Sequence, residues 1–78
     1  MKTTGYFDAI RRRSDRIAID ARWIEEVVSR PERKQTQLDG RIRRWGRIAE
    51  AKNRWLRVVV LADGVTVHNA FFDRRFRP

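Results

Sequence analysis

The fold is decided by residues 54–72, which read RWLRVVVLADGVTVHNAFF. Two runs rich in β-branched and aromatic residues flank the dipeptide Asp63-Gly64, which is typical of the turn of a β-hairpin. The period of two in these runs predicts strands over Arg54–Leu61 and Val65–Phe72. We therefore expect residues 54–72 to form an antiparallel hairpin.

The register of this hairpin determines which side chains share a face. With a two-residue loop at 63–64, the cross-strand pairs are Ala62 with Val65, Val60 with Val67, Val58 with Asn69, and Leu56 with Phe71. This nearly apolar face should meet the helices. On the opposite face, Arg57 would lie opposite Ala70, with His68 as its diagonal neighbour about 7–8 Å away at the backbone. That spacing suits one phosphate bound between Arg57 and His68.

A second hairpin is expected upstream, around the turn signal Asp39-Gly40. Arg41–Ala49 is predicted to be its second strand, and Lys34–Leu38 is either a short strand or an extended lead-in. A loop of odd length turns Ile42, Gly46 and Ile48 inward and leaves outward the row of Arg41, Arg43, Trp45 and Arg47. A loop of even length reverses this. We favour the odd loop because it buries two isoleucines and exposes the arginines.

The N-terminal half carries two helical patterns. Phe7, Ile10 and Ile17 are spaced for a helix over residues 6–18. Asp20 is a candidate N-cap for a second helix that Pro31 ends. The apolar stripe of this second helix is Trp23, Ile24, Val27 and Val28.

These elements predict an α+β fold. We expect two N-terminal helices packed on one face of a three- to four-stranded antiparallel sheet. Residues 1–78 should form a single domain, with a basic C-terminal tail over residues 73–78.

The charge of the chain indicates its class of partner. Among 78 residues there are 19 Lys and Arg, 16 of them Arg, against 10 Asp and Glu, which gives a net charge of +9. Arg presents a planar fork to phosphate and stacks on bases, so nucleic acid is the expected partner. The alternatives are an acidic protein partner and a charge that serves only solubility.

Other classes of function are excluded by what the sequence lacks. It has no cysteine, so disulfides and thiolate metal sites are ruled out. No cluster of carboxylates suggests a two-metal site, and we expect no cofactor. The longest apolar run, Val58–Ala62, is too short for a membrane span, and the first six residues lack the apolar stretch of a signal peptide. We therefore expect a cytoplasmic protein.

Basic and aromatic side chains interleave on the expected outer face of the sheet. That face would hold Arg41, Arg43, Trp45, Arg47, Trp55, Arg57, His68 and Phe72. Single-stranded RNA is bound on such faces, where Arg pairs with phosphates and bases stack on Trp. The predicted RNA-binding set is Arg41, Arg43, Trp45, Arg47, Arg54, Trp55, Arg74 and Arg75. Trp45 and Trp55 have an alternative role as packing residues beneath the tail that carries Phe76.

RNA cleavage is one activity that such a face could support. RNA supplies its own nucleophile, the 2′-hydroxyl, so an enzyme must move protons and stabilise charge on the phosphate. His68, the only histidine, would move the protons, and Arg57 would clamp the phosphate without a metal. A lone histidine on a sheet face is more often a structural or merely exposed residue than a catalytic one. Asp73 is expected to pair with a nearby arginine rather than to act as a base.

A family of small bacterial proteins, catalogued mainly as a domain of unknown function, resembles this chain over Trp23–Glu32, Gln37–Trp45, Arg54–Val60 and Val67–Phe76. That family is similar to the BrnT and RelE-like toxins of type II toxin–antitoxin systems, which are compact basic α+β ribonucleases. The resemblance implies an RNA-cleaving toxin whose partner is an acidic or partly disordered antitoxin protein. The lack of a carboxylate cluster makes a metal-independent endoribonuclease the expected form of that activity. The alternatives are a non-catalytic RNA- or DNA-binding module and an interaction domain for an acidic protein.

Overall fold

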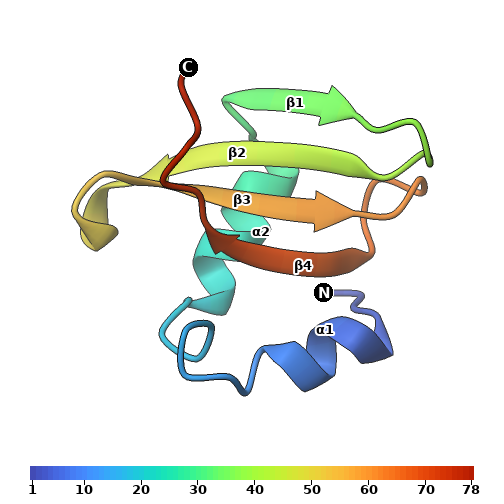
Figure 1. The fold of residues 1–78 in the computed structure, drawn as a ribbon, viewed down its shortest axis with the longest axis horizontal. Helices are drawn as coiled ribbons and strands as arrows, with labels where there is room; N and C mark the ends of the chain where they lie inside the picture. Colours follow the sequence, from blue (N-terminus) through green and yellow to red (C-terminus); the bar gives the residue numbers. More distant parts are fainter.

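A computed structural model describes all 78 residues and shows a four-stranded antiparallel sheet in the order β1-β2-β3-β4 (Figure 1). The strands are β1 (Arg33–Thr36), β2 (Ile42–Ile48), β3 (Arg54–Val60) and β4 (Val67–Phe72). Each strand pairs with its neighbour in the sequence, so the sheet is a meander. The α+β class is confirmed, and the segment that the sequence left open as a lead-in is a short strand.

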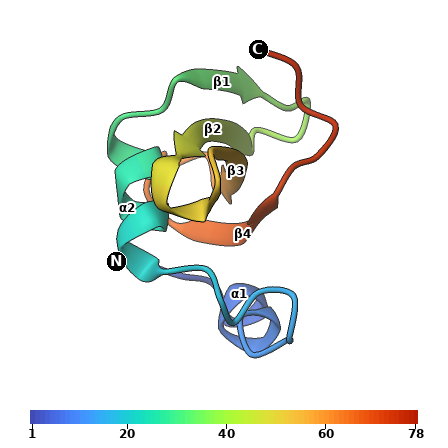
Figure 2. The ribbon, with the colours of Figure 1, turned by 90° about the vertical axis from the view of Figure 1, so that its left-hand side faces the viewer.

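Helix α2 (Ala21–Ser29) packs across β2 and β3 and covers one face of the sheet (Figure 2). The predicted N-cap is confirmed, because the Asp20 carboxylate accepts a hydrogen bond of 2.8 Å from the amide of Arg22. Ile24 and Val27 are the fully buried members of its apolar stripe. A short 3-10 turn, η1 (Ala49–Ala51), joins β2 to β3.

Helix α1 (Gly5–Ile10) lies beside the edge strand β4 and contributes Phe7 to the core (Figure 2). The prediction that both helices pack on one face was therefore wrong, because only α2 lies across the strands. The sequence predicts a helix as far as residue 18, whereas the helix ends after six residues. The prediction was wrong because it relied on Ile17, which is 71% exposed. The buried residue of this segment is Ile19, and the chain reaches it through a series of turns.

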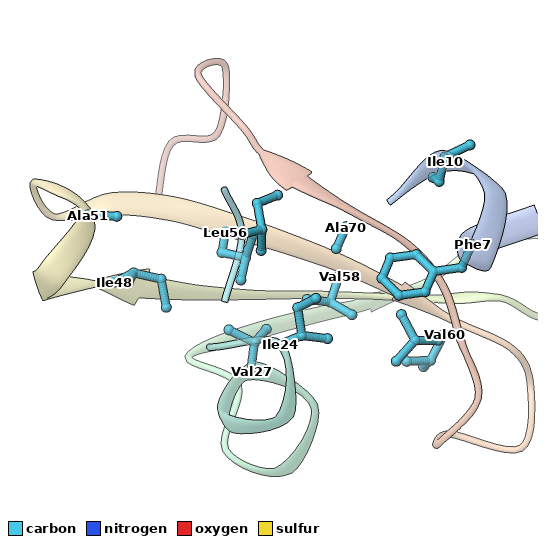
Figure 3. Packing of buried hydrophobic residues seen from close by; sticks show 12 residues of the cluster. Phe7, Ile10, Ile24, Val27, Ile48, Ala51, Leu56, Val58, Val60 and Ala70 are labelled. Atoms are coloured by element: carbon cyan, nitrogen blue, oxygen red, sulfur yellow. The ribbon is translucent and has the colours of Figure 1, made fainter. Parts of the chain in front are cut away.

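The core fills the space between the helices and the inner face of the sheet, and β3 is its centre (Figure 3). Leu56, Val58 and Val60 of β3 are completely buried, as is Val67 of β4. No polar or charged residue is buried in the core. The prediction that Leu56, Val58 and Val60 share the inner face of β3 is therefore confirmed.

The first hairpin has the odd loop that the sequence favours. The amide of Gln37 donates to the carbonyl of Arg41 over 2.8 Å, which leaves three residues, 38–40, in the loop. The Asp39 carboxylate accepts the amide of Arg41 at 3.0 Å, and Gly40 adopts a φ of 90° that suits glycine. The side chains on the inner face are Ile42, Arg44, Gly46 and Ile48, and those on the outer face are Arg43, Trp45 and Arg47.

The second hairpin departs from its predicted register. The observed pairs are Val60 with Val67, Val59 with Asn69, Val58 with Ala70, Arg57 with Phe71, and Leu56 with Phe72. Only the first was predicted, because β4 contains one extra residue, His68, in a β-bulge. The bulge buries Ala70 and turns the polar Asn69 outward, whereas the regular register would place Asn69 in the core. Phe72, predicted on the outer face, packs against the core instead.

The loop of this hairpin is also longer than the two residues expected. The amide of Leu61 donates to the carbonyl of Thr66, so residues 62–65 form the loop. The Asp63 carboxylate accepts the amides of Val65 and Thr66, each at 2.9 Å, and the hydroxyl of Thr66. These bonds, with the Thr66 hydroxyl contributing most, lower the pKa of Asp63 from 3.8 to about 2.

Gly46 permits the close approach of α2 to the sheet. A Cβ at this position would lie 2.8 Å from Cγ2 of Val27, which is buried and cannot move aside. We expect Gly46→Ala to lower the free energy of unfolding by about 1–3 kcal/mol in urea titrations. Gly5→Ala is the control, because nothing lies within 4 Å of a Cβ there, and it should be neutral or slightly stabilising. Equal stability of the two variants would contradict this packing.

The Asp63 carboxylate should make folding sensitive to acid. Its pKa is depressed in the folded protein, so its contribution is present above the unfolded value of 3.8 and is lost as the pH falls toward 2. We expect urea unfolding of Asp63→Asn to show a smaller loss of stability between about pH 4 and 2 than wild type, and a constant offset from wild type between about pH 5 and 7. If the stability of the wild type and of Asp63→Asn fell by the same amount between about pH 4 and 2, Asp63 would not be the source of the acid sensitivity.

Candidate nucleic-acid interface

The C-terminal tail, residues 73–78, folds over the outer face of the sheet, on the side opposite α2 (Figure 2). The ring of Phe76 stacks on Trp45 with centroids 4.6 Å apart and meets Trp55 edge-on at 4.9 Å. Trp45 is only 7% exposed as a result. The two tryptophans therefore take the packing role that the sequence left open, and Trp45 offers no free face to a base while the tail is in place.

Asp73 attaches the tail to the sheet. Its Oδ2 accepts the indole N–H of Trp45 at 3.0 Å and lies 3.7 Å from Nη1 of Arg57. Its Oδ1 accepts the amide of Arg75 at 3.1 Å. Burial raises the pKa of Asp73, but the hydrogen bonds from Trp45 and the Arg75 amide, with the charge of Arg57, outweigh burial and hold the pKa below its usual value. Asp73 thus pairs with an arginine, as the sequence leads us to expect.

Arg57 is enclosed on the outer face rather than open to solvent. Its guanidinium lies 5.0 Å from the ring centroid of Phe71 and 5.9 Å from that of Trp45, and its side chain is 22% exposed. Burial lowers the pKa of Arg57, and the neighbouring charge of Arg43 lowers it further. Its Nε has no hydrogen-bond partner. Most of the interactions of Arg57 are therefore internal.

His68 lies at the bulge, where its ring meets the N-terminal segment. Its Nδ1 is 3.0 Å from the hydroxyl of Thr4, and its ring stacks on Tyr6 with centroids 4.8 Å apart. Burial lowers the pKa of His68, and the charge of Arg41 adds to this effect.

The predicted pairing of His68 with Arg57 was wrong. The bulge places Phe71 opposite Arg57, three residues along β4 from His68, or about 10 Å at the usual rise of a strand. His68 contacts Thr4 and Tyr6 whereas Arg57 contacts Asp73 and Phe71, so these residues do not form the single phosphate site that the regular register implies.

Arg41 and Arg43 do not line the cleft that the tail forms with the sheet. Arg41 is exposed just before β2 and pairs with Asp39 at 3.7 Å. Arg43 is half-buried, and its Nη1 donates to Oε1 of Gln35 at 3.3 Å. These two members of the predicted set lie toward the β1–β2 loop.

Arg44 is a structural arginine on the inner face. Its Nη1 donates to the carbonyl of Val28 at 2.7 Å and to that of Gly64 at 2.8 Å. It joins the end of α2 to the β3–β4 loop and takes no part in an outer binding surface.

A cleft opens at the base of the tail. Its lining residues, which we call the tail cleft, are Arg54, Trp55, Phe72, Asp73, Arg74, Phe76, Arg77 and Pro78. Its volume is about 270 Å³. The guanidinium of Arg54 lies 3.9 Å from the centroid of Phe72, and that of Arg47 lies 4.8 Å from the centroid of Trp55. Cationic groups and aromatic rings thus meet in one hollow.

The positive charge of the tail cleft is not neutralised by the protein. The exposed arginines in and beside it that form no ion pair are Arg47, Arg54, Arg74, Arg75 and Arg77. The only acidic lining residue, Asp73, is already bonded to the tail and the sheet. The site therefore has capacity for a negatively charged ligand.

The tail cleft brings together part of the predicted RNA-binding set. Four of the predicted residues line it, or lie against Trp55 in its wall: Arg47, Arg54, Trp55 and Arg74. Sequence reasoning missed Arg77. The alternation of arginine with Phe76 in the tail is the signal that could have found it, because it repeats the basic and aromatic pattern of the sheet.

No protein-family model, curated protein or solved structure matches this chain. The resemblance to a family of BrnT- and RelE-like proteins stays a prediction. No group of three or more His, Cys, Asp or Glu side chains is placed to hold a metal ion. Neither helix has the length and apolar character needed to cross a lipid bilayer.

Phe76→Ala should uncover both tryptophans beneath the tail. Loss of the ring exposes the indoles, so their fluorescence should shift to longer wavelength and acrylamide should quench it more strongly. The free energy of unfolding should fall by about 1–3 kcal/mol. Arg75→Ala keeps the ring and the backbone amide, so its emission should match wild type. An unchanged spectrum for Phe76→Ala would mean that the tail is not seated in solution.

Proposed function

We propose that the protein binds single-stranded RNA through the tail cleft. The observation that carries this proposal is the cluster of arginines without acidic partners beside the rings of Trp55, Phe72 and Phe76. Arginine on the backbone phosphates and aromatic rings against the bases are the two elements of single-stranded nucleic-acid binding. The net charge of +9 adds a long-range attraction that speeds encounter.

The size of the cleft favours a single strand over a duplex. At about 270 Å³ it is smaller than the sites of drug-sized ligands, which occupy about 300–1,000 Å³. It therefore suits one base or sugar-phosphate unit at a time. Arg54 on β3 and Arg74 and Arg77 on the tail line it, so their guanidinium groups can contact phosphates on both sides of that unit.

Fluorescence anisotropy with a labelled single-stranded RNA measures this binding. We expect Arg54→Ala/Arg77→Ala to weaken the affinity about tenfold at low salt. The slope of the logarithm of affinity against the logarithm of salt concentration should become shallower by about 1.4, since each lost phosphate contact removes about 0.7.

Arg12→Ala/Arg13→Ala is the matched control for this experiment. It removes the same charge from two exposed arginines in the turns after α1, outside the tail cleft. It should change the affinity by no more than about twofold, because exposed charges that are distant from the ligand are screened by salt. Equal losses in the two double variants would show that diffuse charge binds RNA and that the cleft does not.

A toxin-like, metal-independent ribonuclease is the second candidate, and the orientation of His68 favours it. In the tautomer whose Nδ1–H donates to the Thr4 hydroxyl, Nε2 has a free lone pair and no protein partner, so it can accept a proton. The lowered pKa of His68 favours the neutral ring that this role needs. Two charges act on the pKa of His68: that of Arg41 lowers it, and that of Asp39, the ion-pair partner of Arg41, raises it. In this scheme Arg41 rather than Arg57 would assist at the phosphate. In this scheme the fold is a relative of the BrnT- and RelE-like toxins, with an acidic antitoxin as partner.

Incubation of RNA with the purified protein in EDTA tests the second candidate. We expect defined cleavage products that disappear with His68→Gln, while the affinity of that variant for RNA stays at the wild-type value. Intact RNA after incubation with the wild-type protein would eliminate the ribonuclease and leave the binding function standing.

A further inference from the structure

Strand β1 forms an open edge of the sheet (Figure 1). It pairs only with β2, and all of its residues are exposed. The amide of Gln37 donates to the carbonyl of Arg41, so Gln37 bonds to β2. In an antiparallel ladder every second residue bonds to the same neighbour. The backbone N–H and C=O groups of Lys34 and Thr36 therefore point away from β2. No strand of this chain pairs with them. Such an edge is a template for another extended chain.

The opposite edge of the sheet is closed by the protein itself. The amide of Thr4 donates to the carbonyl of Val67 at 3.0 Å, and the amide of Val67 donates to the carbonyl of Lys2 at 2.9 Å. Helix α1 lies beside the same strand (Figure 2). The fold thus protects one edge and leaves β1 open.

The charges on β1 select the chemistry of a partner. Arg33 and Lys34 form no ion pair, and the adjacent carboxylate of Glu32 is engaged by the backbone amide of Arg47 at 2.6 Å. A second copy of this chain paired along β1 would bring like charges together, which is destabilising. An acidic strand would neutralise them.

An apolar contact is available where β1 ends. Leu38, in the loop after β1, is fully exposed. It lines a hollow whose other residues are Gln35, Thr36, Gln37, Asp39 and Arg43. A chain paired with the backbone of Thr36 would bring one of its side chains against Leu38.

We infer that β1 binds an acidic, extended segment of a partner protein as an additional strand of the sheet. The backbone of Lys34 and Thr36 supplies the hydrogen bonds, and Arg33 and Lys34 attract the carboxylates. Leu38 packs against one apolar side chain of the segment. This surface shares no residue with the tail cleft, so the protein can hold the segment and RNA together.

A peptide of alternating Glu and Val, capped at both ends, is the probe, and a Lys-Val peptide of the same length is its control. Amide hydrogen exchange followed by NMR reports the pairing. With the Glu-Val peptide bound, the amides of Lys34 and Thr36 should exchange about tenfold more slowly. The Lys-Val peptide should leave them unchanged. Failure of the Glu-Val peptide to protect either amide would overturn the inference.

Thr36→Pro removes one outward N–H while leaving the ladder to β2 intact. It should weaken binding of the Glu-Val peptide about tenfold, whereas Thr36→Ala should bind as wild type does. The affinity of both variants for RNA should not change, which separates this inference from RNA binding in the tail cleft. Dimerisation of the wild type that Thr36→Pro abolishes would overturn the inference in favour of a second copy. Peptide-induced shifts centred on Trp55 would overturn it in favour of the cleft.

Discussion

The hydrogen bond from the indole of Trp45 to the carboxylate of Asp73 is the interaction on which the outer face depends. A carboxylate placed over a sheet loses hydration, and two hydrogen bonds and the charge of Arg57 compensate for that loss. With Asp73 fixed, Phe76 covers Trp45 and Trp55. Without it, three aromatic side chains would form an exposed patch on a small protein.

The seated tail also turns a general excess of charge into local sites. It brings Arg74 and Arg77 into one cleft with Arg54, where cations repel one another until a polyanion binds. A second, smaller concentration of positive charge lies on the open edge of the sheet, at β1. Both surfaces are positively charged, but they fit ligands of different shape. The cleft accepts a flexible phosphate backbone, and the edge accepts an extended peptide backbone.

Local patterns could predict the elements that depend on local physics. The cap at Asp20 defines the start of α2. The alternation around Ile42 decides which face of β2 points into the core, because the opposite face carries arginines. The bulge in β4 could not be predicted from alternation, since β4 carries apolar side chains on both faces. Its only signal was the polar Asn69, which a regular register would bury. The tail cleft depends on Asp73 meeting Trp45 across 28 residues of sequence, and no local pattern encodes that contact.

The three tryptophans provide a direct test of where RNA binds. Trp55 lines the tail cleft, Trp45 lies beneath the tail, and Trp23 donates from α2 to Glu50 on the other face at 3.4 Å. The measurement is an NMR titration of the three indole N–H signals with single-stranded RNA. Binding in the tail cleft predicts that the Trp55 signal shifts first and furthest. The Trp23 signal should shift less, because the Trp23 ring reaches the cleft only through its edge-on contact with Phe72, at 6.3 Å between centroids. A larger shift of Trp23 than of Trp55, or a shift of Trp23 alone, would contradict it.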